Sequence, residues 1–265
     1  MKTVAIVLAA GSGRRMNTDV KKQYIDIGGK PVLYYSLNVF QNSFIDEIIL
    51  VTAKEDMEYC KSEIVQKYGF NKVRCVVSGG KERYNSVMNG LRMIDSCDYV
   101  YVHDGARPFI DQEMLLRLQR NVEEFGTAVA AVSSKDTVKI VDDENFVIST
   151  PNRKTIWLIQ TPQVFRYDLL CEAYERMYSR MQNIEIEGIT ITDDAMVVEN
   201  FTNVNVKLVE GAYKNIKLTT PEDLLTADAF ANNEEYLNAA MSNDAMYLND
   251  PYATGEIETN GYYGY

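Results

Sequence analysis

Short apolar runs rich in valine and isoleucine recur along the chain, separated by polar turns. Runs that are apolar at nearly every position are typical of strands buried on both faces of a sheet. We therefore expect strands at residues 4–8, 48–51, 73–77, 99–102, 128–132 and 204–209.

Between these runs, apolar residues recur every three or four positions, which is the spacing of one helix face. Leu33, Leu37 and Phe40 form one such face, and similar faces lie at 87–94, 115–125 and 170–177. Strands that alternate with helices predict an α/β fold, with a Rossmann-like, mainly parallel sheet flanked by helices. Ligands of such sheets bind beyond the carboxyl ends of the strands, so we expect the site in strand-to-helix loops.

Residues 135–160 break this alternation. Two strand-like pieces, 137–141 and 146–149, flank a turn that contains Asp142, Asp143 and Asn145. We interpret this region as a projecting β-hairpin arm.

The last clear helix is predicted to begin at Thr220, an N-cap residue followed by Pro221 at the first helical position. Helical periodicity is lost beyond about residue 240, where Gly, Asn, Asp and Tyr dominate. We predict one domain over residues 1–240 and a disordered acidic tail over 241–265.

The composition favours an intracellular globular protein. A chain of 265 residues, 46% of them hydrophobic, can bury a large core. Because no apolar run is long enough to span a membrane and no signal pattern opens the chain, we expect a cytoplasmic protein without a membrane partner. The cysteines lack paired spacing, so we expect reduced, mostly buried thiols at Cys60, Cys75, Cys97 and Cys171.

The net charge of −11 is unevenly distributed. Residues 231–265 contain six acidic residues and no Lys or Arg, so this segment supplies −6 of the total. The rest of the chain is mildly acidic and offers no broad basic face for nucleic acid. A local cluster of cations at a phosphate site is compatible with this balance.

The first predicted strand is followed by AAGSGRRM, residues 9–16, and then by KQY, residues 22–24. Small residues let backbone N–H groups approach phosphate oxygens, and Arg15 and Lys22 add positive charge. The loop lacks the GK[ST] of a Walker A motif and the third glycine of a dinucleotide fingerprint. Taken alone, it is equally well explained as a tight turn with solvated arginines.

Two further motifs, GGKERYNSV (79–87) and VHDGARPF (102–109), also follow predicted strands. Gly80 and the Ser86 hydroxyl are placed to contact a base, ribose or phosphate. Asp104 is a candidate ligand of Mg²⁺, directly or through water, because that ion takes one or two carboxylates. The structural alternatives are an ordinary helix start and an ion pair between Asp104 and Arg107.

Together with QTPQVF (160–165), TDDA (192–195) and EGAYKNIKLTTPEDL (210–224), these motifs resemble the 2-C-methyl-D-erythritol 4-phosphate cytidylyltransferase family, in its order, over residues 3 to about 230. The resemblance implies a fold like that of nucleotide-diphospho-sugar transferases. It also implies the reaction of CTP with methylerythritol phosphate, with release of pyrophosphate, in non-mevalonate isoprenoid precursor synthesis.

The resemblance further implies a role for individual residues. Catalytic stabilisation of the reacting groups is expected from Arg15, Lys22, Arg153 and Lys217. The CTP pocket is expected to be lined by Ala9, Ala10, Gly11, Gly13, Gly80, Ser86 and Gly105. The acceptor is expected to be held by Asp104, Arg107, Thr137, Arg153, Thr161 and Lys217.

We also expect Mg²⁺ or another divalent cation as cofactor, held on the triphosphate with help from Asp104. The resemblance implies a homodimer in which the arm reaches across to the neighbouring subunit. Thr137 and Arg153 are therefore expected to act in the partner's site. Lys81 departs from the pattern, since some members carry an acid there that contacts the nucleotide.

Two alternatives remain open. A related cytidylyltransferase for ribitol 5-phosphate shares the glycine-rich loop, KQ and TPQ, although GARPF and TDDA favour methylerythritol. The second alternative is a non-catalytic nucleotide-binding regulator, because one fold can carry unrelated functions. The joint presence of Arg15, Lys22, Asp104 and Lys217 argues against it.

Three more residues could carry chemistry but have simpler interpretations. His103 is the sole histidine, and its place at a strand end favours a structural role over a catalytic one. Asp193 and Asp194 precede a short apolar segment, and we favour a helix cap over a metal site there.

The expected nucleophile is the acceptor's own phosphate, which is already largely dianionic at neutral pH.

Overall fold

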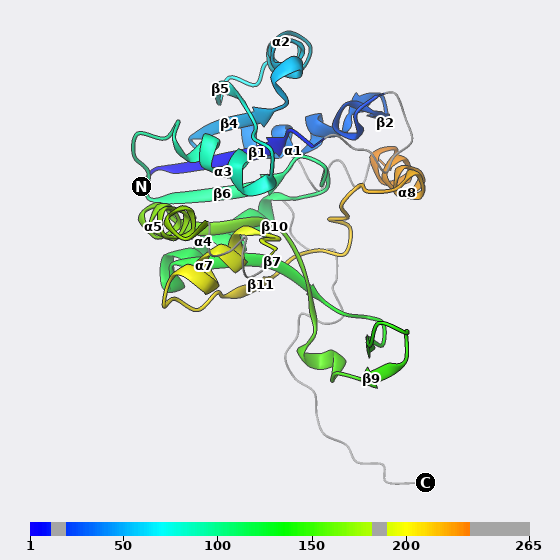
Figure 1. Cartoon of the computed structure of the whole chain (residues 1–265). Helices are drawn as coiled ribbons and strands as arrows, with labels where there is room; N and C mark the ends of the chain where they lie inside the picture. Colours follow the sequence, from blue (N-terminus) through cyan, green and yellow to red (C-terminus); the bar gives the residue numbers. More distant parts are fainter. Residues whose placement is uncertain (12–19, 182–189, 234–265) are drawn as a thin grey trace, which may run out of the picture.

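A seven-stranded sheet forms the centre of the computed structural model, which describes residues 1–11, 20–181 and 190–233 (Figure 1). The strand order across this sheet is β11-β7-β10-β6-β1-β4-β5. Its strands are β1 (Thr3–Ala9), β4 (Glu47–Thr52), β5 (Val73–Ser78), β6 (Tyr99–Asp104), β7 (Thr127–Ser133), β10 (Trp157–Arg166) and β11 (Leu208–Glu210). The main helices are α1 (Val32–Gln41), α3 (Arg83–Leu91), α4 (Gln112–Phe125), α5 (Tyr167–Ser179), α7 (Asp194–Phe201) and α8 (Pro221–Ala231).

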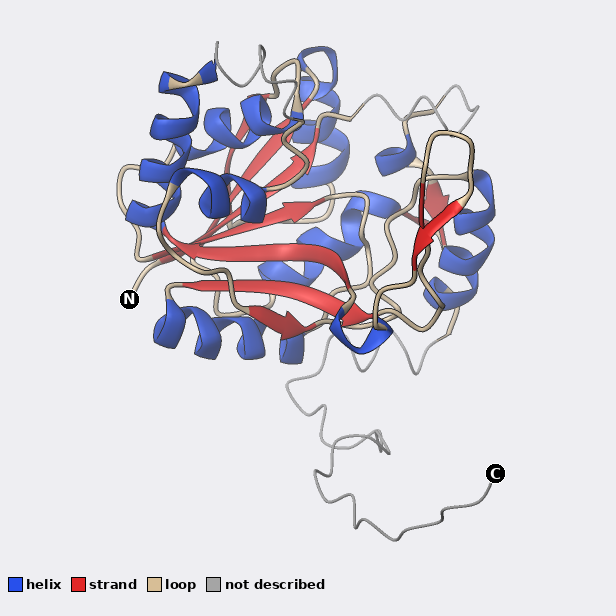
Figure 2. Cartoon of the chain, turned by 60° about the horizontal axis from the view of Figure 1, so that its bottom comes forward, coloured by secondary structure: helices blue, strands red, loops and turns tan. Residues whose placement is uncertain are grey.

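Helices cover both faces of the sheet (Figure 2). Ala5 and Val7 of β1 face the cluster formed with α1 and α4, whereas Val4 and Ile6 face α3, α5 and α7. Alternate side chains of one strand thus enter two separate cores, which explains why the strands read as continuous apolar runs. The predicted α/β, Rossmann-like architecture is confirmed.

Most neighbouring strands are parallel, as expected, but β10 runs antiparallel to both β6 and β7. The apolar pattern did not predict this strand. Pro162 lies inside it, and proline normally argues against a central strand; the pairing with β7 shifts register between Ile159 and Gln163. The last residues of the predicted arm, 157–160, therefore belong to the central sheet.

The predicted hairpin arm is confirmed. β8 (Ile140–Val141) pairs antiparallel with β9 (Val147–Ser149), and the pair lies away from the sheet at the end of two long connections (Figure 1). A short second hairpin, β2 (Asp26–Ile27) with β3 (Lys30–Pro31), precedes α1.

The strand predicted at 204–209 is wrong for its first four residues, because β11 begins only at Leu208. The Thr127 hydroxyl donates to the Asn205 carbonyl and accepts from the Lys207 N–H, so these backbone groups are bonded to a side chain instead of a ladder. The sequence reading also missed a helical segment, α2 (Met57–Tyr59), which continues as a π-helical stretch over Cys60–Gln66.

The predicted start of α8 is confirmed. Thr220 and Asp223 form a capping box, with proline in the first turn, and the helix packs on Ile27, Val32 and Phe109. The proposed boundary at residue 240 stays a prediction, because residues 234–265 lie outside the described part of the chain.

Two further findings concern membranes and cysteines. Among the described residues, no helix has the length and apolar character needed to cross a membrane. All four cysteines are free, as expected. The expectation that most are buried is wrong, since only Cys60 is buried and the other three are partly exposed.

Candidate active site

A cavity of about 460 Å³ opens where β1 and β6 end, at the predicted edge of the sheet. Eight residues with a predicted catalytic or binding role line it: Ala9, Ala10, Gly11, Lys22, Gly80, Ser86, Asp104 and Lys217. Other lining residues include Gln23, Lys81, Glu82 and Arg83. A single pocket therefore collects residues from five of the motifs, although they span more than 200 positions of sequence.

Hydrogen bonds fix the loops that surround the cavity. The Gln23 amide donates to the carbonyls of Ala9 (2.8 Å) and Gly11 (3.2 Å), which ties the KQY turn to the end of β1. On the opposite wall, the Gly80 N–H donates to the Ser86 hydroxyl over 3.1 Å. A Cβ at Gly80 would lie 2.3 Å from Asn85 Cβ, so this close approach needs glycine.

Lys22 lies on the 3₁₀ turn Lys22–Tyr24. Its ammonium donates to the Leu218 carbonyl over 2.9 Å, which brings it to the segment that carries Lys217. Two lysine side chains that are 195 positions apart in sequence therefore enter one pocket. Such a pair of cations suits a ligand with several phosphate groups.

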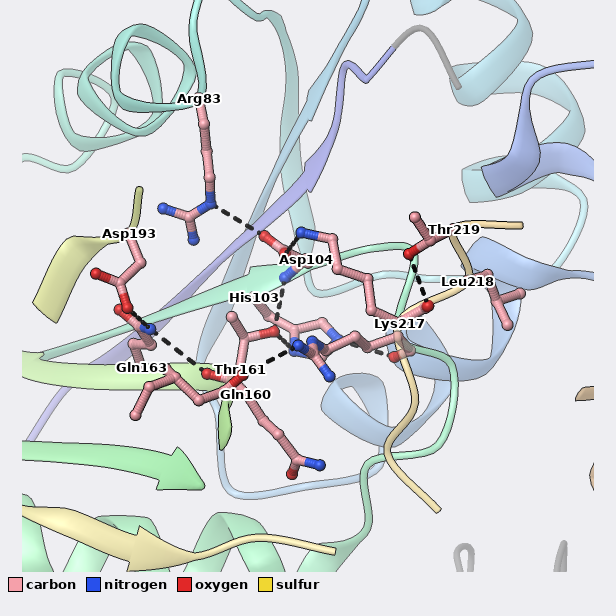
Figure 3. A network of polar contacts seen from close by, with 12 residues as sticks. Arg83, His103, Asp104, Gln160, Thr161, Gln163, Asp193, Lys217, Leu218 and Thr219 are labelled. Carbon is pink, nitrogen blue, oxygen red and sulfur yellow. Dashed lines mark hydrogen bonds and ion pairs between the residues drawn. The ribbon is translucent and has the colours of Figure 1, made fainter. Parts of the chain in front are cut away.

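Asp104 ends β6 and is the centre of an ion-pair network (Figure 3). Its Oδ2 lies 2.6 Å from Lys217 Nζ and its Oδ1 lies 3.2 Å from Arg83 Nε. Burial alone would raise the pKa of Asp104, but Arg83 and Lys217 outweigh it and hold the pKa well below its ordinary value. The pocket therefore contains an ionised carboxylate.

The alternative of an Asp104–Arg107 ion pair is not what the structure shows. The Arg107 guanidinium donates instead to the carbonyls of Asn215 (2.7 Å) and Ile159 (3.3 Å). Arg107 thereby joins the Lys217 segment to β10 and is not among the residues that line the cavity.

His103 and Thr161 form a chain of hydrogen bonds that fixes the backbone of Asp104. The Thr161 hydroxyl accepts from the Asp104 N–H over 3.0 Å and contacts His103 Nδ1 at 3.0 Å, while His103 Nε2 contacts the Arg107 carbonyl (Figure 3). Complete burial lowers the pKa of His103 to about 4. The imidazole is thus neutral at pH 7 and fully bonded, in agreement with a structural histidine.

The remaining predicted residues lie elsewhere. Thr137 and Arg153 are on the exposed arm, where Arg153 donates to the Lys135 carbonyl. Gly105 follows Asp104, and its N–H donates to the Leu8 carbonyl. Gly13 and Arg15 lie outside the described residues.

A scan against family models matches residues 3–233 to the model described as 2-C-methyl-D-erythritol 4-phosphate cytidylyltransferase. The chain belongs to this family. Curated relatives with that name include proteins of Lachnospira eligens, 51% identical over 85% of this chain and 97% of the relative, and Lachnoclostridium phytofermentans, 50% identical over 86% and 95%.

Solved structures of the family have the same fold. The 4-diphosphocytidyl-2C-methyl-D-erythritol synthase of Anaerococcus prevotii superposes with a TM-score of 0.74 at 38% identity, covering 86% of this chain and 95% of that one. The Francisella tularensis 2-C-methyl-D-erythritol 4-phosphate cytidylyltransferase superposes with a TM-score of 0.70 at 33% identity, covering 86% and 99%.

Two residues of the cytidylyltransferase motifs differ from the sequence-based prediction: Arg83, which had no predicted role, and Asp194, for which a helix cap was expected. Arg83, in GGKERYNSV, lies between Asp104 and Asp194, and its Nη2 is 2.8 Å from Asp194 Oδ2. Asp193 caps α7 by accepting from the Met196 N–H, which agrees with the predicted cap, but Asp194 does not cap. No sequence signal distinguished the two acids, because both are compatible with a helix start.

Proposed function

We propose that this chain transfers a cytidylyl group from CTP to 2-C-methyl-D-erythritol 4-phosphate, with release of pyrophosphate, in non-mevalonate isoprenoid precursor synthesis. The observation that carries the proposal is the pocket that gathers Lys22, Lys217 and ionised Asp104. Two cations in one pocket suit a reaction between two phosphate groups. Membership of the family supplies the identity of the substrates.

The nucleotide half of the site is proposed to be the glycine-rich wall. Gly11 and Gly80 lie at loops where backbone N–H groups can approach phosphate or ribose oxygens. Lys22 adds charge to the same pocket, which Ala9 and Ala10 also line. The roles of Gly13 and Arg15 stay predictions, since both lie outside the described residues.

The acceptor half is proposed to be the Asp104–Lys217 edge. The Lys217 ammonium suits the acceptor's phosphate, and the Asp104 carboxylate suits its hydroxyl groups. Arg107 and Thr161 hold the chain segments that carry these two residues, through hydrogen bonds to the Asn215 carbonyl and the Asp104 N–H.

In the proposed mechanism, an oxygen of the acceptor's phosphate forms a bond to the α-phosphorus of CTP. The bond from that phosphorus to the oxygen bridging toward the β-phosphate breaks, and its electron pair leaves with pyrophosphate. Because a phosphate monoester has a second pKa of about 6, no protein base is required at neutral pH. The protein supplies alignment and positive charge, chiefly through Lys22 and Lys217.

We further propose that Mg²⁺ enters with the triphosphate. Among the described residues, no group of three or more His, Cys, Asp or Glu side chains could form a metal cage. One ionised carboxylate, Asp104, fits the mode in which Mg²⁺ takes one or two carboxylates together with phosphates and waters. When bound, the ion would supply positive charge to the triphosphate, with Asp104 holding it directly or through water.

A homodimer through the arm is also proposed, with the chain residing in the cytoplasm. The arm exposes Phe146, Val147 and Ile148, which are 68%, 57% and 65% accessible. Adjacent exposed apolar residues on a projecting hairpin suit burial against a second subunit. Such a dimer would bring Thr137 and Arg153 to the partner's pocket.

Mixing two inactive variants tests this arrangement. Lys22→Ala and Arg153→Ala subunits, unfolded together and refolded, should form hybrid dimers with one intact site. Activity should recover to about a quarter of wild type, since half of the dimers are hybrid and each has one of two sites. No recovery from two inactive parents would show that Arg153 acts within its own chain, and full activity of Arg153→Ala before mixing would show that Arg153 has no role.

The substrates are tested by pyrophosphate release with CTP, Mg²⁺ and either methylerythritol 4-phosphate, ribitol 5-phosphate or no acceptor, with ATP, GTP and UTP as controls. We expect release only with CTP and methylerythritol 4-phosphate. A preference for ribitol 5-phosphate would change the acceptor while leaving the phosphate site intact. If neither acceptor gave pyrophosphate release, a role limited to nucleotide binding would be favoured.

A further inference from the structure

A line of alternating charges leads from the interior of the protein to the acceptor edge of the pocket. It begins at Asp194, which is fully buried and accepts a hydrogen bond from the Tyr174 hydroxyl over 2.6 Å. Arg83 follows, 2.8 Å from Asp194 Oδ2, and then Asp104 and Lys217.

Asp194 is not needed for the start of α7. Asp193 already caps this helix, and the Asp194 backbone N–H is bonded to the Gln163 amide oxygen. The Asp194 carboxylate instead points to Arg83 and Tyr174. The buried Asp194 carboxylate therefore interacts with an arginine of the pocket instead of capping a helix.

Arg83 has charged partners on both sides. Burial alone would lower the pKa of its guanidinium, but Asp194 and Asp104 raise it well above the ordinary value. The guanidinium is therefore a permanent cation that bridges two carboxylates. With Asp194 on its other side, Arg83 contacts Oδ1 of Asp104 and leaves Oδ2 to Lys217 (Figure 3).

We propose that Asp194 and Tyr174 are positioning residues that hold Arg83 on Asp104 and thereby set the affinity for the acceptor. An arginine without its buried partner would be free to turn toward the phosphates of the bound substrates, because charge-assisted bonds to phosphate are strong. Asp104 would then lose one of the two cations that fix its carboxylate. The inference rests on the proposed role of Asp104 and Lys217 in acceptor binding.

Asp194→Asn tests the proposal, since it keeps the shape and an acceptor for Tyr174 but removes the charge opposite Arg83. The KM for methylerythritol 4-phosphate should rise about tenfold, as expected for one member of an ion-pair network. The KM for CTP should change less than the KM for the acceptor, because the glycine-rich wall and Lys22, which are proposed to bind the nucleotide, are held by other hydrogen bonds, to Ser86 and to the Leu218 carbonyl. The matched control is Asp193→Asn, which retains a good cap and should leave both KM values unchanged.

Tyr174→Phe is a second, milder variant, because removing one charge of a buried pair also weakens the fold. It should raise the acceptor KM by about threefold through loss of one hydrogen bond to the Asp194 carboxylate. Its control is Tyr101→Phe, a fully buried tyrosine whose hydroxyl bonds Gln119 on the other face of the sheet. Tyr101→Phe should destabilise the protein to heat about as much as Tyr174→Phe does, without a change in the acceptor KM.

A double variant separates positioning from a general loss of stability. If Asp194 acts through Arg83, then Arg83→Gln with Asp194→Asn should have the acceptor KM of Arg83→Gln alone, within about twofold. The inference would be overturned if the increases in acceptor KM of the two single variants multiplied in the double variant, or if folded Asp194→Asn had an unchanged acceptor KM. If Asp104→Asn and Lys217→Ala also leave the acceptor KM unchanged, the proposed acceptor site itself is wrong.

Discussion

Replacing Lys22 by alanine should separate catalysis from stability. The ammonium lies in the pocket and donates to the Leu218 carbonyl over 2.9 Å. A cation about 4 Å from a phosphate charge contributes about 4 kcal/mol at an effective dielectric constant of about 20. Loss of one such donor in an enzyme site typically costs about 3 kcal/mol, so kcat should fall about a hundredfold. The free energy of unfolding should fall by only about 1 kcal/mol, the contribution of one hydrogen bond.

The assay is steady-state pyrophosphate release, paired with urea unfolding. Lys21→Ala is the matched control, because the neighbouring ammonium pairs with Glu55 and Asp56 and does not line the cavity. We expect its kcat to stay within about threefold of wild type. Wild-type turnover in Lys22→Ala, or an equal loss in both variants, would refute the assignment of the reacting phosphates to Lys22.

Three further predictions concern the stability of the fold. Thr161→Val should lower the free energy of unfolding by about 1–3 kcal/mol in urea titrations, because the Asp104 N–H loses its acceptor. The sole imidazole, His103, should titrate near pH 4 by NMR. The pKa of His103 in the folded protein lies below the unfolded value of 6.5, so its contribution to the free energy of unfolding is fully present above pH 6.5. This contribution, on the order of 3 kcal/mol, should be lost as the pH falls toward 4, as measured by acid unfolding curves. Gly126→Ala should cost about 1 kcal/mol in a thermal melt, with kcat unchanged, because Gly126 ends α4 at a φ of 75°.

The sequence predicts those parts of the fold in which local pattern and tertiary burial agree. β1, β4, β5 and β6 are apolar on both faces because helices cover both faces, and the capping box of α8 is a local signal. β10 is not identified from the sequence because Pro162 interrupts it and its first residues, 157–160, fall within the predicted arm. Only the long-range pairing with β6 and β7 makes it a strand.

The same limit applies to the site. Glycine-rich turns after strands predict which loops meet, since parallel strands share one edge. The sequence does not show that Asp104 pairs with Arg83 and Lys217 instead of Arg107, because ion-pair partners depend on side-chain direction across three elements. The different roles of Asp193 and Asp194 were hidden for the same reason.

The origin of each product oxygen tests the proposed reaction most directly. The chain is incubated with CTP, Mg²⁺ and methylerythritol 4-phosphate whose phosphate is labelled with ¹⁸O, and both products are analysed by mass spectrometry. Direct attack of the acceptor's phosphate on the α-phosphorus predicts that all label stays in the cytidine diphosphate-linked product and that pyrophosphate is unlabelled. Label in pyrophosphate, or the absence of a cytidylyl product, would contradict the account.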